Sequence, residues 1–162
     1  MNTKTELVIT SRSGEKLNVS QLRGRVAVVG FLSKAACHTT PALELLDQVF
    51  LELGSSNISA FGCIVDLDPG EELRDYYPFT IQVGSASRRH VAEFLERSMS
   101  GFALPQFLVF DRRGKQRLVF TIPRGDTFWE VVDNFKLPIS AIVNEPSATQ
   151  VPQPYTGQES AE

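Results

Sequence analysis

The sequence predicts an α/β fold in which helices cover both faces of one mixed β-sheet. Three apolar runs, one starting at Val26 and the others at Ile58–Val65 and Gln106–Phe110, are typical of buried strands. Segments with helical spacing of their apolar residues alternate with these runs, as in α/β proteins. Short strand pairs near both ends of the chain add antiparallel edges and an N-terminal β-hairpin.

The two strand pairs are predicted from short apolar runs on either side of polar turns. Glu6–Thr10 and Leu17–Val19 flank a polar connection, which is typical of a hairpin. Towards the other end, Gln106–Phe110 is followed by the turn Asp111-Arg112-Arg113-Gly114 and then by Arg117–Ile122. A turn this short can join only antiparallel neighbours, so both pairs are expected to be antiparallel.

The remaining elements follow from apolar periodicity and from the positions of Gly and Pro. They are a strand from Val26, a helix from Thr39 or Thr40 to Leu53, a strand at Ile58–Val65, a helix from Asp68 to about Tyr76, a strand at Phe79–Val83, a helix at Ser87–Arg97 and a helix at Asp126–Phe135. A chain of 162 residues is long enough for one domain with a sizeable core. We assign residues 1–143 to that domain. Residues 144–162, rich in Pro, Ser and Gln, form a tail that is expected to be disordered.

The composition argues against some classes of partner. A net charge of −3 and a pI near 5.5, without a Lys or Arg run, argue against binding to nucleic acid. No apolar stretch is long enough for membrane insertion, and no signal peptide precedes Leu7. If Met1 is the native start, a cytoplasmic location is expected, whereas an exported protein from which a leader was trimmed is equally compatible.

The stretch Val26–Thr40 carries the residues with the clearest chemistry. Its apolar strand breaks into a short polar loop, and Cys37 comes just ahead of the predicted helix. A thiol at a helix N-terminus lies among unpaired N–H groups at the positive end of the helix dipole, and both favour the nucleophilic thiolate. Lys34 or His38 can add positive charge. Cys37 is therefore either an attacking thiolate or a relic in a degenerate site.

The neighbouring candidates each have more than one interpretation. His38 either lowers the Cys37 pKa and shuttles a proton or is a solvated loop side chain. Thr40 can donate a hydrogen bond to a Cys37 thiolate, or it can simply cap the helix. Cys63 lies mid-strand and is expected to be a small buried hydrophobe that forms no disulfide with Cys37. His90 is expected to be solvated. No zinc site is predicted, since the usual ligand spacings are missing, and no cofactor is expected.

Two blocks of the sequence carry a family resemblance. Gly14–Phe31 reads G-E-K-L-N-V-S-Q-L-R-G-R-V-A-V-V-G-F, and Gly101–Lys115 reads G-F-A-L-P-Q-F-L-V-F-D-R-R-G-K. In this order and spacing they resemble the redoxin-type thioredoxin-fold proteins, over roughly residues 5–137. These are the TlpA/ResA-like thiol-disulfide oxidoreductases, related to AhpC/TSA peroxiredoxins. The resemblance implies a thioredoxin-like fold.

The same resemblance implies a role for the segment around Pro105. Pro105 matches the cis-proline that faces the active-site cysteine in the family. Leu104 and Ala103, just before it, would lie with it in the groove that receives the partner chain. Without the resemblance, Pro105 is explained as a proline at the start of a strand, which is common.

The chain also departs from the family at the positions that carry the chemistry. In place of Cys-x-x-Cys it has Cys-His-Thr-Thr, so Thr40 stands where the second cysteine is expected. Ala36 stands where the family has a Trp before the first cysteine. The peroxiredoxin motif Pro-x-x-x-Thr-x-x-Cys is absent as well, because Gly30 and Lys34 occupy its Pro and Thr positions.

These departures lead to three hypotheses of different classes. The first is an oxidoreductase that acts through one thiol, with a protein or a low-molecular-weight thiol or disulfide as its partner. The second is a catalytically silent thioredoxin fold that serves as a binding or scaffold module. The third, with less support, is a one-cysteine peroxide reductase. The pH dependence of Cys37 alkylation separates the first two hypotheses, because only an activated thiol reacts at its full rate well below pH ~8.

Overall fold

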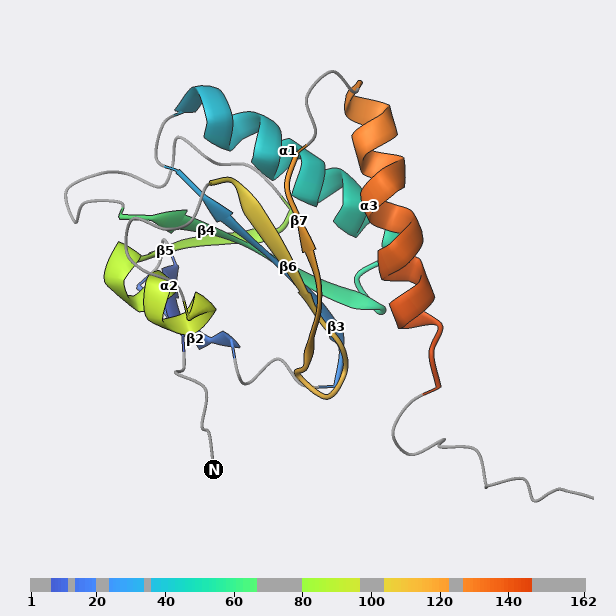
Figure 1. Cartoon of the computed structure of the whole chain (residues 1–162), viewed down its shortest axis with the longest axis horizontal. Coiled ribbons are helices and arrows are strands. Elements are labelled where there is room, and N and C mark those ends of the chain that lie inside the picture. Colours follow the sequence, from blue (N-terminus) through green and yellow to red (C-terminus); the bar gives the residue numbers. More distant parts are fainter. Residues whose placement is uncertain are drawn as a thin grey trace, which may run out of the picture.

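The structure is a computed structural model that describes residues 7–11, 14–19, 24–33, 36–66, 80–96, 104–122 and 127–146. These residues contain seven strands and three helices (Figure 1). The strands are β1 (Val8–Ser11), β2 (Lys16–Asn18), β3 (Val26–Leu32), β4 (Ile58–Val65), β5 (Gln82–Ala86), β6 (Gln106–Phe110) and β7 (Gln116–Phe120). The helices are α1 (Ala36–Leu53), α2 (Arg88–Leu95) and α3 (Phe128–Val143).

All seven strands belong to one mixed sheet with the order β2-β1-β5-β4-β3-β6-β7. The central strands β3, β4 and β5 are parallel, and every residue of β3 is buried. The pairs β1–β2, β1–β5, β3–β6 and β6–β7 are antiparallel. The predicted α/β class, the mixed sheet and the N-terminal hairpin are therefore confirmed.

Helices cover both faces of this sheet, as expected (Figure 1). The side chains of each strand alternate between the two faces, so the buried residues divide into two clusters. On one face α1 and α3 pack over Val28, Leu32 and Phe107. On the other face α2 packs over Phe31 and Phe110, and its Phe94 ring lies between theirs, with centroids 6.3 and 5.9 Å away.

Glycines in two central strands bring α1 close to the sheet. A Cβ on Gly30 would lie 2.7 Å from Leu46 Cδ1, and a Cβ on Gly62 would lie 2.5 Å from Leu43 Cδ2. Both distances are shorter than any real carbon–carbon contact, so only glycine allows the α1 leucines to sit directly on the backbone of β3 and β4. The sequence of these strands thus fixes how closely the helix that carries Cys37 approaches.

Several boundaries differ from the predicted ones. Ile58–Val65 and Gln106–Phe110 are strands over the predicted residues. Helix α1 begins earlier than predicted, at Ala36. Helix α3 continues to Val143, because Ile139 and Ile142 add buried turns beyond Phe135 despite the proline at 138.

The β5 strand starts later than predicted because its approach is tied to α1. The carboxylate of Asp47 accepts hydrogen bonds from the backbone N–H groups of Thr80 and Ile81, at 2.8 and 3.2 Å, and from the Thr80 hydroxyl. These N–H groups therefore donate to a side chain of α1 and not to a neighbouring strand, so strand pairing begins at Gln82. The helix predicted from Asp68 to Tyr76 and residues 147–162 of the predicted tail lie outside the described residues.

Candidate active site

The topology brings the candidate residues to one end of the sheet. The parallel strands β3, β4 and β5 all end there, and α1 begins shortly after the end of β3. Strand β6 runs in the opposite direction, and its first residue, Gln106, pairs with Phe31 near the end of β3. The start of α1 and the segment Leu104–Pro105 therefore meet at this end, which we call the candidate redox end.

Cys37 is the second residue of α1, in the first turn of an 18-residue helix. The first-turn N–H groups of a helix have no intrahelical acceptor, so the N-terminus favours a negatively charged neighbour. The first turn contains no acidic residue that could occupy them. The side chains of Cys37 and His38 lie outside the described part of the structure, as does Lys34.

Two further α1 residues shape this first turn. Thr40 is exposed and stands three residues after Cys37, a spacing that places both on the same side of a helix. Pro41 is exposed and lies inside the helix. Because proline has no N–H, it cannot donate the i→i−4 hydrogen bond to the carbonyl oxygen of Cys37. The first turn is thus held to the next by fewer hydrogen bonds than an ordinary helix start.

The Leu104–Pro105 bond is cis, as the family resemblance implies. Both residues are half-buried. Leu104 packs against the cluster under α2, which fixes the segment on that face of the sheet. Ala103, the third predicted groove residue, lies outside the described residues.

The second cysteine, Cys63, is buried and does not have the reactivity expected of Cys37. Cys63 is a free thiol in β4 with no exposed surface, and it packs in the cluster beneath α2. Burial raises the pKa of Cys63 to about 12. The prediction that Cys63 is a buried hydrophobe is therefore confirmed, and its thiol is not ionised near neutral pH.

The sequence interpretation missed an ion pair at the candidate redox end. Asp66 follows the last residue of β4 with a φ of 62°, in the left-handed region. Its carboxylate accepts a hydrogen bond from the backbone N–H of Arg88 at 2.6 Å and lies 3.5 Å from the Arg88 Nε. An acidic residue directly after a buried parallel strand is a signal that could have identified it. His90, in the first turn of α2, is exposed as predicted, and its backbone N–H donates to Ser87 Oγ at 3.2 Å.

The fold is shared with solved structures of low sequence identity. A thiol:disulfide interchange protein of the thioredoxin family from Chlorobium tepidum TLS aligns with a TM-score of 0.64 and 16% identity, over 86% of this chain and 94% of that one. A secreted Mycobacterium tuberculosis disulfide oxidoreductase homologous to E. coli DsbE has a TM-score of 0.63 and 16% identity, over 87% and 99%. The thioredoxin domain of a Bacteroides vulgatus thiol-disulfide oxidoreductase has a TM-score of 0.60 and 15% identity, over 83% and 95%.

The chain has a thioredoxin-like fold. No protein-family model matches the sequence, and no curated protein sequence matches it. The fold expected from the sequence resemblance is thus confirmed by the structural similarity alone. Within the described ranges, no helix combines the length and the apolar character that crossing a membrane requires.

Proposed function

We propose that this chain is a thiol-disulfide oxidoreductase that acts through a single thiol, Cys37. The observation that carries the proposal is the placement of Cys37 in the first turn of α1, at the sheet end where Leu104 and Pro105 also lie. Solved structures of the same fold are named thiol:disulfide interchange protein and disulfide oxidoreductase, which supports this chemistry.

The reaction starts with the thiolate of Cys37 attacking one sulfur of a disulfide in a partner protein. A new S–S bond forms between Cys37 and the partner, the partner's own S–S bond breaks, and its second sulfur leaves as a thiolate that takes up a proton. A low-molecular-weight thiol then attacks the Cys37 sulfur of the mixed disulfide and releases the reduced partner. A second such thiol regenerates Cys37. In total, two external thiols become one disulfide while the partner disulfide becomes two thiols.

The residues around Cys37 have supporting roles in this proposal. The N–H groups at the start of α1 stabilise the thiolate, and His38 moves the proton. Thr40 donates a hydrogen bond from its hydroxyl, since it has no sulfur with which to resolve the mixed disulfide. Leu104 and Pro105, with Ala103, bind the partner's backbone beside the cysteine.

The test is the rate of Cys37 alkylation by iodoacetamide as a function of pH, with thiol loss followed by mass spectrometry. Because Cys63 has a pKa of about 12 and no exposed surface, the native protein reports Cys37 without a background variant. An activated thiol gives a rate that reaches its plateau well below pH ~8. A rate that is still rising beyond pH ~8.5, the ordinary cysteine pKa, would overturn the proposal.

A second candidate function is a binding module that uses the same groove without chemistry. The observation in its favour is Thr40, which is exposed on α1 in the position of the missing second thiol. A binding module is expected to hold its partner equally well when Cys37 is replaced by Ser, whereas the oxidoreductase loses its covalent complex. Wild type and the Cys37→Ser variant are each incubated with a disulfide-containing protein such as insulin and compared by non-reducing electrophoresis. A covalent complex that forms with wild type only supports the oxidoreductase.

A further inference from the structure

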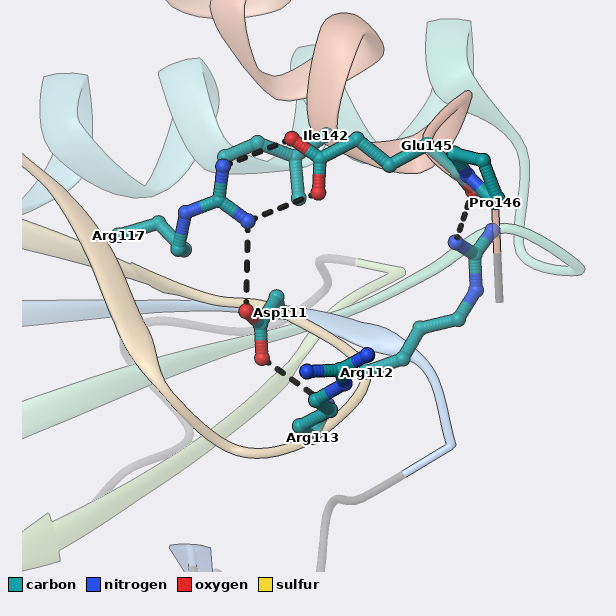
Figure 2. A pocket seen from close by; sticks show the side chains of 7 residues that line it. All are labelled: Asp111, Arg112, Arg113, Arg117, Ile142, Glu145 and Pro146. Carbon is teal, nitrogen blue, oxygen red and sulfur yellow. Dashed lines mark hydrogen bonds and ion pairs between the residues drawn. The ribbon is translucent and has the colours of Figure 1, made fainter. Parts of the chain in front are cut away.

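A pocket lies at the opposite end of the sheet from the candidate redox end. It has a volume of about 180 Å³ and is lined by Asp111, Arg112, Arg113, Arg117, Ile142, Glu145 and Pro146 (Figure 2). These residues come from the β6–β7 turn, from β7, from the last turn of α3 and from the segment just after it. Strand β6, five residues long, separates the pocket from Pro105, a distance of about 17 Å along the strand. The pocket is therefore outside any site that Cys37 forms.

The two carboxylates of the pocket are both engaged by the same guanidinium. Arg117 donates to the two carboxylate oxygens of Glu145 at 2.8 and 2.7 Å, a bidentate contact, and to Asp111 Oδ2 at 3.3 Å. The other oxygen of Asp111 accepts the backbone N–H groups of Arg113 and Lys115, at 2.9 and 3.0 Å. This arrangement leaves little acceptor capacity for another cation.

The two remaining guanidinium groups form no direct hydrogen bond or ion pair with a carboxylate within the described ranges, and Arg112 acts on the Glu145 carboxylate only through its charge at longer range. Arg112 donates to the backbone carbonyls of Val143 and Glu145, at 2.6 and 3.2 Å, so it caps the end of α3 and keeps further N–H groups unused. Figure 2 shows Arg112 and Arg117 approaching the end of α3 from opposite sides. The side chain of Arg113 makes no hydrogen bond or ion pair with a described residue. Three cations and two carboxylates thus line one pocket.

We propose that this pocket binds a singly charged carboxylate, with Arg113 and the unused N–H groups of Arg112 as donors. A guanidinium presents paired N–H groups that match the two oxygens of a carboxylate. One negative charge balances the excess of one positive charge in the lining. The carbonyl groups at the end of α3 carry partial negative charge, which disfavours a ligand of higher charge. The carboxylate is either that of a small molecule or a Glu or Asp side chain of a partner protein.

The experiment is a titration of the ¹⁵N-labelled protein with sodium acetate, followed by two-dimensional NMR and compared with sodium chloride at equal ionic strength. We expect saturable shifts of the backbone amides in the β6–β7 turn and at the end of α3, with acetate only. Arg113→Gln is expected to weaken binding about tenfold, the loss of one charge-assisted contact. The matched control is Arg89→Gln, which removes the same charge from an exposed position on α2 and leaves the affinity unchanged.

A second arm uses a short peptide with blocked ends and one Glu. Saturable binding of acetate and peptide assigns the pocket to any accessible carboxylate, and binding of the peptide alone assigns it to a partner protein. Shifts that chloride reproduces, shifts that stay linear, or equal affinity in Arg113→Gln and wild type would overturn the proposal. Since the Arg113 side chain has no described partner, the variant is expected to unfold at the same temperature as wild type. Unchanged thermal unfolding would show that lost binding is not lost structure.

Discussion

The two ends of the sheet differ in how the charges and the helix terminus at each end are compensated. At the pocket end, Arg117 joins β7 to Glu145 and Arg112 caps the last carbonyls of α3, so side chains satisfy the charges and the helix end. At the candidate redox end, the first turn of α1 has no acidic residue, and Pro41 has no N–H to give to Cys37. The end of α3 is capped by a side chain, whereas the first turn of α1 contains no acidic side chain to offset the positive end of the helix dipole. The comparison separates an end of the sheet that is tied together by ion pairs and a helix cap from an end whose helix start carries a cysteine and no acidic residue.

The comparison is tested most directly by removing the thiol from the candidate redox end. Cys37→Ser is expected to reduce alkylation at pH ~7 by more than about a thousandfold. With a pKa of about 12, Cys63 is ionised to only about one part in 10⁵ at that pH, and it is buried as well. The measurement is the rate of iodoacetamide incorporation. Unfolding the variant in guanidinium chloride provides the control, because Cys63 then becomes reactive. Fast alkylation of the folded variant would mean that Cys63 is accessible.

Adding a second thiol sharpens the comparison at the same end. Thr40→Cys places a thiol three residues after Cys37, on the same side of α1, where it can attack a mixed disulfide. We expect the rate of insulin reduction with dithiothreitol to rise several-fold, and the covalent complex with a disulfide substrate to become shorter-lived. Thr40→Ser keeps the hydroxyl and serves as the control. Brisk insulin reduction by the wild type would contradict a one-thiol mechanism.

The central strands were predictable from the sequence because their signal is local. Apolar β-branched runs mark Ile58–Val65 and Gln106–Phe110 without any knowledge of their neighbours. The start of β5 was not predictable in this way. It depends on the Asp47 carboxylate, which lies 33 residues earlier in the chain and binds the backbone of Thr80. The length of α3 likewise depends on a tertiary contact, the burial of Ile139.

The candidate site was predictable only in part. Cys37 and Pro105 could be singled out because one has a reactive side chain and the other matches a family block, and the structure places their segments at one end of the sheet. Asp66 and Arg88 were missed, since neither belongs to a motif and the parallel pairing of β4 and β5 brings them together. The charged pocket was missed for the same reason, because Glu145 meets Arg117 across 28 residues.

The close approach of α1 to the sheet depends on the glycines of the central strands, and Gly62→Ala tests it. The added Cβ would lie 2.5 Å from Leu43 Cδ2, so the buried Leu43 side chain, the helix or the strand must shift, at an expected cost of about 1–3 kcal/mol in the free energy of unfolding. Urea unfolding measures this cost. In a Leu43→Ala background the same substitution is expected to cost less, because the clashing methyl group is gone. Equal costs in the two backgrounds would show that Leu43 does not set the spacing.

The smallest expected effect is at the pocket end, where Glu145→Gln removes the anion that pairs with Arg117. Hydrogen bonds from Arg117 lower the pKa of Glu145 below its ordinary value of 4.5. The pKa of Asp111 is also lowered: burial acts to raise it, but hydrogen bonds from the backbone of Lys115 and Arg113 and from Arg117 outweigh burial. A carboxylate with a lowered folded-state pKa stabilises the fold above its unfolded-state pKa, and this stability is lost as the pH falls through the folded-state value.

Wild type is therefore expected to be slightly more stable than Glu145→Gln near pH 7, and the difference is expected to disappear as the pH falls below 4.5 and through the lowered pKa of Glu145. The effect is small because Glu145 and Arg117 are both partly exposed to solvent, where water and salt screen the pair. Urea midpoints measured from pH ~7 to ~3 give the profile. Glu15→Gln, which changes an exposed carboxylate with no described side-chain partner, is the matched control and should leave the profile unchanged.

If Glu145→Gln and wild type differ by the same amount at every pH, the stabilisation at this end does not come from the ionised pair. The cap that Arg112 forms on α3 would then be the main anchor of the pocket end.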